Sequence, residues 1–167
     1  ITAFDSTKYR GKTGSEAKEF IRAHPLKNLR HDRLDRASHL LIHTAHEALA
    51  DAGLAAKVSN AEVFACLGTT LGGMISGEKY HSEIIQKGIK KARLSPMLDY
   101  LAQSQAINLF KEFELDGSFV VFSNACASGS NAIGHAFNAV RTGTVEIAIA
   151  AGFDTMSEFT FAGFNSL

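Results

Sequence analysis

Apolar and polar residues follow two different periods along this chain, and these periods predict helices that alternate with buried strands. From about residue 32, apolar residues recur at spacings of three and four, which is typical of one buried helix face. They are Leu34, Ala37, Leu41, Ala45, Ala48, Leu49 and Ala52. Asp32 or Asp35 can cap this helix at its start, and Gly53 is its expected end.

The next segments continue the alternation. Glu62–Gly68 is an apolar run of strand length, and after a glycine-rich bend we expect a helix from about Met74 to Lys87, before Gly88. Pro96 lies near the start of a further helix. Its expected core positions are Leu98, Leu101, Ala102, Ile107 and Leu109.

In the last third of the chain, the pattern of apolar residues predicts two more strands, one before and one after a helix. Asp116–Gly117 is a predicted turn, Ser118–Ser123 a continuous apolar strand, and Val145–Ala151 another buried strand. Between the strands, the small residues Asn124–Ser128 lead into a helix that extends to about Arg141. Near-continuously apolar strands separated by helices indicate an α/β fold, with a parallel or mixed sheet covered by helices on both faces.

The domain organisation follows from where these periods begin. Residues 1–31 show neither period and are rich in Lys, Arg and Gly, so we expect an extended, irregular segment. It belongs to the same domain as residues 32–167, which carry all the predicted helices and strands.

Composition and charge narrow the class of protein. The chain has 167 residues, 46% of them hydrophobic, with 17 basic and 17 acidic side chains. A net charge of zero gives no electrostatic reason to expect nucleic acid or an anionic membrane as a partner. The longest uncharged apolar run, Ile147–Phe153, is too short to cross a bilayer.

The cysteines and the N-terminus add an expectation about context. Two cysteines sixty residues apart cannot form a disulfide framework, which indicates a reducing compartment, and we expect a cytoplasmic protein. The chain starts Ile-Thr-Ala-Phe-Asp without an initiator Met or a signal peptide, so we expect part of a longer polypeptide.

The strongest chemical signal is a cysteine at a junction between strand and helix. Cys126 stands between two alanines, and a tight turn of this kind needs small neighbours because it pushes the middle side chain outward. At a helix N-terminus the sulfur faces unpaired backbone N–H groups, which favour the thiolate and lower the cysteine pKa from its free value near ~8.5. These N–H groups, that of Cys126 included, can also hold a developing oxyanion. We therefore predict that Cys126 is a nucleophile.

The neighbours of each cysteine in the chain also bear on other interpretations of the two thiols. A free cysteine is often a buried, inert residue, and that is the interpretation we give to Cys66, inside an apolar strand. A hydrolase or glutaminase elbow usually has glycine two residues before and after its nucleophile. This chain has Asn124 and Ser128 there, which disfavours a hydrolase.

A resemblance to a known family rests on these same residues. Ala125–Gly129, followed by Asn131–Ala136, looks like the active-site segment of the β-ketoacyl–acyl-carrier-protein synthases. Further segments that look like family segments are Asp32–Ala37, Gly68–Gly73, Ser95–Met97, Ala150–Asp154 and Phe161–Leu167. The sequence departs from the family pattern at Asn124, where threonine is usual, and at Thr70, where glycine is commoner.

The resemblance implies a thiolase-like fold, of which this chain would form the N-terminal half, and a homodimer in the full-length protein. The implied activity is that of a 3-oxoacyl-acyl-carrier-protein synthase in fatty-acid or polyketide synthesis. In the family, the cysteine accepts an acyl chain, a malonyl thioester loses carbon dioxide, and the resulting carbanion attacks the acyl-cysteine. The implied partners are acyl carrier protein and malonyl or acyl thioesters, and no cofactor or metal is implied.

The resemblance also indicates what this chain lacks. The two histidines and the lysine that support the family's reaction lie in the second half of the polypeptide. His135 cannot replace them, because it lies nine residues into the helix that follows Cys126, roughly 13 Å along the axis. We therefore expect this chain to hold the nucleophile and part of the acyl pocket, and not to turn over alone.

Four apolar residues are candidates for the acyl pocket by their match to family positions. Leu71 matches a position that touches the acyl chain, and Phe164 matches a side chain that gates access to the cysteine. Met97 falls near a position that reaches the partner subunit's pocket, and Phe161 is a further candidate. The alternative for each is ordinary core packing.

A histidine stripe offers a different kind of site. His39, His43 and His46 lie at i, i+4 and i+7 of one predicted helix, a spacing that can present imidazoles to a metal. The stripe is expected opposite the apolar face, so exposure to solvent or packing against a partner is the preferred interpretation and no metal is predicted.

Two alternative functions stay open beside the synthase. Some ketosynthase-like chains are non-catalytic partners that set chain length in a heterodimer, although they usually lack the cysteine. A thiolase acting on CoA esters shares the broad architecture, but it fits the register of residues 125–129 less well.

Overall fold

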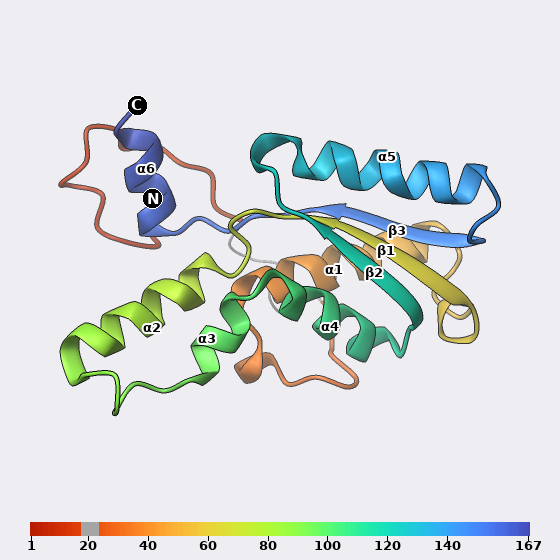
Figure 1. Ribbon diagram of the computed structural model, residues 1–167, viewed down its shortest axis with the longest axis horizontal. Helices are drawn as coiled ribbons and strands as arrows, with labels where there is room; N and C mark the ends of the chain where they lie inside the picture. Colours follow the sequence, from red (N-terminus) through yellow and green to blue (C-terminus); the bar gives the residue numbers. More distant parts are fainter. Residues whose placement is uncertain (18–23) are drawn as a thin grey trace.

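A parallel sheet forms the centre of the molecule. The computed structural model describes residues 1–17 and 24–167, which include the strands β1 (Glu62–Gly68), β2 (Asp116–Phe122) and β3 (Ile147–Gly152). All pairs are parallel and the order is β2-β1-β3 (Figure 1). The predicted α/β fold with a parallel sheet is confirmed. Burial of all three strands is not, because only β1 has a strand on both sides, and β2 and β3 stay partly exposed.

Helices cover both faces of this sheet, as predicted. The α-helices are α1 (Arg36–Asp51), α2 (Met74–Lys87), α3 (Ser95–Tyr100), α4 (Ala102–Phe113), α5 (Ser128–Arg141) and α6 (Glu158–Asn165). Short 3₁₀ turns span His31–Arg33, Val58–Asn60 and Ala125–Ala127. Figure 1 shows α5 along one face of the sheet and α1 with α4 along the other. No helix among the described residues is long and apolar enough to cross a membrane.

The core lies between β1 and the α1–α4 layer. Leu41 and Ala45 of α1 pack with Leu67 of β1 and Leu109 of α4, and all four are buried. Asp35 caps α1, since its side chain accepts hydrogen bonds from the N–H groups of Ala37 and Ser38 at 2.8 and 3.0 Å. The predicted stripe is confirmed at these positions, but Ala48 and Ala52 are exposed.

The region after Pro96 differs from the prediction. A single core-facing helix was expected, whereas the chain turns to an extended conformation at Leu101 and forms α3 and α4 as separate helices. Leu98, Leu101 and Ile107 are 56%, 45% and 42% exposed, so their assignment to the core is wrong. The break turns α3 toward α2, away from the sheet, and only α4 buries Leu109.

The predicted turn at Asp116–Gly117 is also wrong, because both residues belong to β2. Gly117 pairs with Val63 of β1, and its φ of +125° is a conformation that side chains rarely adopt. A Cβ there would lie 2.1 Å from the Val63 carbonyl oxygen. The glycine permits close pairing at the start of the strand rather than a reversal of the chain.

The histidine stripe of α1 is buried, which corrects the expectation that it faces solvent. His39 and His43 are only 5% and 3% exposed. The segment before α1 covers them: the ring of His31 stacks on His39 at 5.4 Å, and the ring of His24 lies 5.5 Å from His43. Desolvation by burial lowers the pKa of His39. The helix thus has a second buried face beside its apolar stripe.

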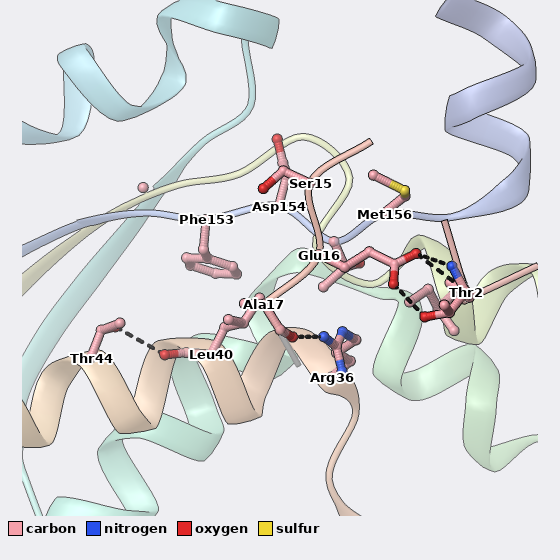
Figure 2. Close-up of a pocket in the computed structure, with 14 residues that line it drawn as sticks. Thr2, Ser15, Glu16, Ala17, Arg36, Leu40, Thr44, Phe153, Asp154 and Met156 are labelled. Carbon is pink, nitrogen blue, oxygen red and sulfur yellow. Dashed lines mark hydrogen bonds between the residues drawn. The ribbon is translucent and has the colours of Figure 1, made fainter. Parts of the chain in front are cut away.

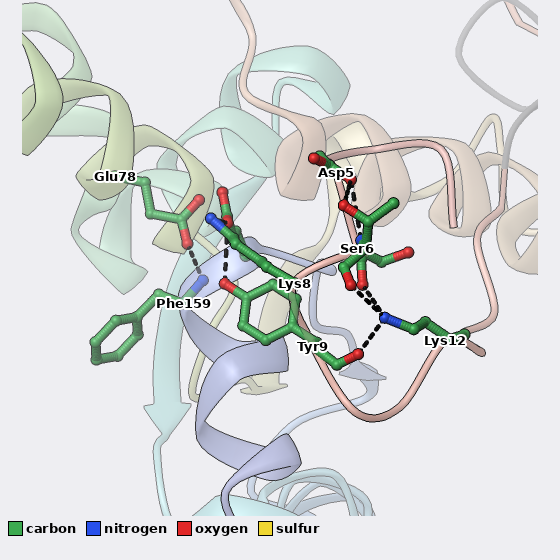
Figure 3. A network of polar contacts seen from close by, with 9 residues as sticks. Asp5, Ser6, Lys8, Tyr9, Lys12, Glu78 and Phe159 are labelled. Carbon is green, nitrogen blue, oxygen red and sulfur yellow. Dashed lines mark hydrogen bonds and ion pairs between the residues drawn. The ribbon is translucent and has the colours of Figure 1, made fainter.

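Residues 1–17 and 24–30 of the N-terminal segment form no helix or strand, and residues 18–23 of the segment predicted as irregular lie outside the described residues. Residues 4–11 pack against α6 through polar contacts (Figure 3). The Tyr9 hydroxyl donates to the Glu158 carboxylate at 2.9 Å, and Lys8 forms an ion pair with the same carboxylate. The rings of Phe4 and Tyr9 both lie 5.3 Å from that of Phe161. These contacts hold α6 at the carboxyl end of the sheet.

Candidate active site

Cys126 lies at the junction that the sequence predicted. β2 ends at Phe122, the 3₁₀ turn Ala125–Ala127 contains the cysteine, and α5 begins at Ser128. The cysteine is exposed. The sulfur is therefore available to a reagent rather than packed among hydrocarbon side chains.

The residue before the cysteine has a strained backbone. Ala125 has a φ of +55°, in the left-handed region that costs an L-residue roughly 1–2 kcal/mol. Such strain persists where surrounding contacts over-determine it, and it gathers at functional sites. Ser128 supplies two of these contacts: its hydroxyl donates to the Ala125 carbonyl at 2.7 Å and accepts from the Asn124 N–H at 2.9 Å.

The start of α5 lies unusually close to the end of β1. A Cβ added to Gly68 would be 2.4 Å from the carbonyl carbon and oxygen of Ser128 and 2.6 Å from the Gly129 nitrogen. Only glycine at position 68 lets the two backbones approach in this way. The same contact places the bend that follows Gly68 beside the cysteine turn.

That bend, Gly68–Gly73, is anchored by a carboxylate from the end of β3. Oδ1 of Asp154 accepts hydrogen bonds from the Thr69 hydroxyl at 2.7 Å, the Thr70 N–H at 3.1 Å and the Leu71 N–H at 2.7 Å. Sequence reasoning assigned no role to Asp154. The available signal was its place after a predicted strand, since the carboxyl ends of parallel strands meet at one edge of the sheet.

A cavity of about 650 Å³ opens between this bend, the cysteine turn and α6. Its lining includes Cys126 and three of the four predicted pocket residues, Leu71, Phe161 and Phe164. Phe164 is 67% exposed, so it borders the mouth rather than the floor. Lining residues to which the sequence analysis gave no role in the pocket include Ser15, Thr70, Met156, Phe159, Thr160 and Leu167. The walls are mostly apolar and suit a hydrocarbon chain better than a charged group.

Met97 is not part of this cavity. It lies on α3, which packs against α2 and α4. Its predicted contact was with the pocket of a second subunit, and that stays a prediction.

A second cavity, of about 570 Å³, is lined by residues 152–156, by the N-terminal segment and by α1 (Figure 2). Figure 2 shows Arg36, Glu16 and Asp154 among its lining residues, together with Leu40 and Phe153. Cys126 does not line it. This more polar space shares Ser15, Asp154, Thr155 and Met156 with the cysteine cavity.

The remaining predicted groups lie away from the site. Cys66 is fully buried against Ala132 and Ala136 of α5, and burial raises the pKa of its thiol, so the predicted inert role fits its surroundings. The ring of His135 packs against Phe64 and Phe122 at 5.7 and 5.4 Å. Within residues 1–17 and 24–167, no histidine or lysine lines the cysteine cavity, and no group of three or more metal-ligating side chains could hold a metal ion.

Comparison with known protein families shows which family has this combination of fold and cysteine turn. Residues 4–167 match the family model described as "Beta-ketoacyl synthase, N-terminal domain". The chain belongs to the β-ketoacyl synthase family. The family resemblance drawn from the residues around Cys126 is therefore confirmed.

Individual relatives of this family give the same result. The chain is 31% identical to "3-oxoacyl-[acyl-carrier-protein] synthase 2" of Synechocystis sp., over 99% of this chain and 40% of that relative. A β-ketoacyl synthase structure from Burkholderia phymatum aligns with a TM-score of 0.70 at 26% identity, over 80% of this chain and 33% of that one. The ishigamide ketosynthase/chain length factor shares the fold, with a TM-score of 0.88 at 23% identity over 99% of this chain and 42% of that one. The thiolase-like fold is thus confirmed, and the chain spans about 40% of the length of the curated relative.

Proposed function

We propose that this chain carries the acyl-accepting nucleophile of a 3-oxoacyl-acyl-carrier-protein synthase, with Cys126 as that nucleophile. The observation that carries the proposal is that Cys126 is exposed and lines a mostly apolar cavity, next to the strained residue Ala125. The relative named 3-oxoacyl-acyl-carrier-protein synthase 2 supports the reaction class.

The first half-reaction is a transfer of an acyl group between two sulfur atoms. The Cys126 thiolate attacks the carbonyl carbon of an acyl thioester, and the carbonyl π pair moves onto oxygen. When the tetrahedral intermediate collapses, the bond from carbon to the donor's sulfur breaks. The donor leaves as a thiolate, which takes up the proton that Cys126 gave to solvent.

Each part of the site has a task in this step. The N–H of Cys126 is proposed to donate to the oxyanion, a kind of contact whose removal typically slows acyl transfer by about 10²–10³-fold. Leu71, Phe161 and Phe164 are proposed to contact the hydrocarbon chain, because they line the cavity with the sulfur. The donor is proposed to be an acyl carrier protein or CoA thioester.

The second half-reaction needs groups that this cavity does not supply. Decarboxylation of a malonyl thioester requires a donor that stabilises the enolate, and the described lining of the cavity includes no histidine or lysine. We propose that the chain as given accepts an acyl group but forms no 3-oxoacyl product, and that condensation takes place in a longer protein and a dimer.

Mass spectrometry of the intact protein tests the proposal. After incubation with an acyl-CoA, an acyl-acyl carrier protein or cerulenin, we expect one equivalent of label on Cys126. Cys126→Ala is expected to show no labelling at position 126, so the rate of labelling of the variant should be at least about 1,000-fold lower than that of the unaltered chain. Cys66→Ala is the matched control and should be labelled normally, since that thiol is buried.

The other outcomes separate the alternatives. Label elsewhere with Cys126 unmodified would overturn the proposal and favour a non-catalytic partner chain. Acylation by CoA esters together with cleavage of 3-oxoacyl-CoA would favour a thiolase.

A further inference from the structure

We propose that the Thr70 hydroxyl is a positioning group for the nucleophile, because with Ser128 it holds the Ala125–Cys126 peptide in the orientation that aims the Cys126 N–H. The inference rests on the proposed function and names a residue that acts through the turn rather than on the substrate. Glycine is commoner at this place in the family pattern, so the hydroxyl is a feature of this chain.

The first step of the argument is a closed set of contacts around Ala125. The Thr70 hydroxyl oxygen accepts a hydrogen bond from the Ala125 N–H at 3.0 Å and lies 3.3 Å from the Ser128 hydroxyl oxygen. Ser128 in turn donates to the Ala125 carbonyl at 2.7 Å. Thr70, Ser128 and Ala125 thus form a hydrogen-bonded ring.

The second step assigns the protons in this ring. A hydroxyl has one proton to donate and can accept twice. Ser128 gives its proton to the Ala125 carbonyl and accepts from the Asn124 N–H, so Thr70 must be the donor in the contact between the two hydroxyls. Thr70 therefore uses its hydroxyl both to accept from the Ala125 N–H and to donate to Ser128.

The third step connects the ring to the reacting atoms. The Ala125 carbonyl and the Cys126 N–H belong to one planar trans peptide, so they point in opposite directions. A hydrogen bond that fixes the carbonyl also fixes the N–H. The ring holds the amide groups on both sides of Ala125, which is the residue with the φ of +55°. The ring therefore sets the orientation of the Cys126 N–H, which is the proposed donor to the oxyanion.

The fourth step explains why Thr70 itself stays in place. Its N–H is held by Asp154 at 3.1 Å, and the same carboxylate oxygen holds Thr69 and Leu71. The carboxylate at the end of β3 thus reaches the turn after β2 through a side chain from the bend after β1. Thr70 also lines the cysteine cavity.

Two reactions of Cys126 distinguish positioning from simple support of the fold. Acylation by a thioester passes through an oxyanion, whereas alkylation by iodoacetamide is a direct displacement with no oxyanion. Both rates are measured on the unaltered chain and on Thr70→Val, which keeps the shape of threonine and removes the hydroxyl. Thr70→Ser keeps the hydroxyl, and Thr142→Val is a control whose lost hydroxyl bonds only at the end of α5.

We expect Thr70→Val to lower the acylation rate by about tenfold or more and to change the alkylation rate by less than about twofold. Thr70→Ser should recover most of the acylation rate, and Thr142→Val should leave both rates unchanged. Equal acylation of Thr70→Val and the unaltered chain would overturn the inference, and so would a parallel loss of both rates. An unaltered chain that is alkylated but never acylated would contradict the proposed function itself, and the role assigned to Thr70 would fall with it.

Discussion

The two cysteines of this chain, one inside a strand and one in the turn after a neighbouring strand, have opposite surroundings. Cys66 lies within β1, opposite Val120 of β2, and the helix α5 covers it with alanine side chains. Cys126 lies just beyond the end of β2, where the same helix begins, and it is exposed beside a cavity. The middle of α5 thus buries the thiol of Cys66, whereas Cys126 lies just before the first residue of the same helix and stays exposed. Chemical availability follows from position along the strand–helix unit, not from residue type.

The difference in burial between positions 66 and 126 is tested most strongly by placing an aspartate at each position in turn. Cys66→Asp would bury a carboxylate at a site that is 0% exposed, so we expect the free energy of unfolding to fall by at least about 3 kcal/mol. Cys126→Asp should change that free energy by less than about 0.5 kcal/mol, because position 126 is exposed. Urea unfolding followed by circular dichroism measures both. Similar losses would show that the two sites do not differ in burial.

A second prediction concerns the contact that brings α5 to the cysteine turn. Gly68→Ala would place a Cβ 2.4 Å from the Ser128 backbone, and we expect a loss of about 1–3 kcal/mol in unfolding free energy together with slower acylation of Cys126. Gly134→Ala is the matched control within α5, because a Cβ there meets nothing within 4 Å. It should stabilise the helix by about 0.5–1 kcal/mol and leave acylation unchanged. If the two substitutions changed the unfolding free energy and the acylation rate equally, the close approach of the backbones at Gly68 would not explain the effect of Gly68→Ala.

The smallest expected effect is a dependence of stability on alkaline pH that comes from the buried thiol. Burial raises the pKa of Cys66 in the folded state, so the unfolded chain loses this proton first as pH rises past ~8.5. The thiol's contribution to stability is complete below that pH and is lost above it, with a slope of at most about 1.4 kcal/mol per pH unit. Comparing urea unfolding of the unaltered chain with that of Cys66→Ala between pH 8 and 10 should show a shallower decline in the variant. Parallel curves would mean that Cys66 titrates alike in both states.

The prediction from sequence succeeded where a signal was local. The strand Glu62–Gly68 and the helix from Met74 to Lys87 occur with those bounds, because apolar period and a terminal glycine lie within a few residues of one another. The Cys126 junction was recognisable for the same reason: small residues follow an apolar strand and precede an amphipathic helix.

The prediction failed where burial depends on a distant segment. His39 and His43 lie on the polar side of the α1 pattern, yet rings from the preceding segment stack against that side and bury it. Leu98 and Leu101 fit a helical period, but the break at Leu101 directs α3 toward α2 instead of the sheet. A period reports which residues share a face, and it contains no information about what packs on that face.

The candidate site shows the same division. The amino-acid sequence alone determined that Cys126 would sit between a strand and a helix, since chain neighbours settle that conformation. Only the tertiary structure decided that Asp154 would anchor Thr70, 84 residues away, and that Thr70 would reach the turn before the cysteine. Contacts of this kind depend on the order in which strands pair, β2-β1-β3, and parallel pairing brings together chain segments that no local pattern connects.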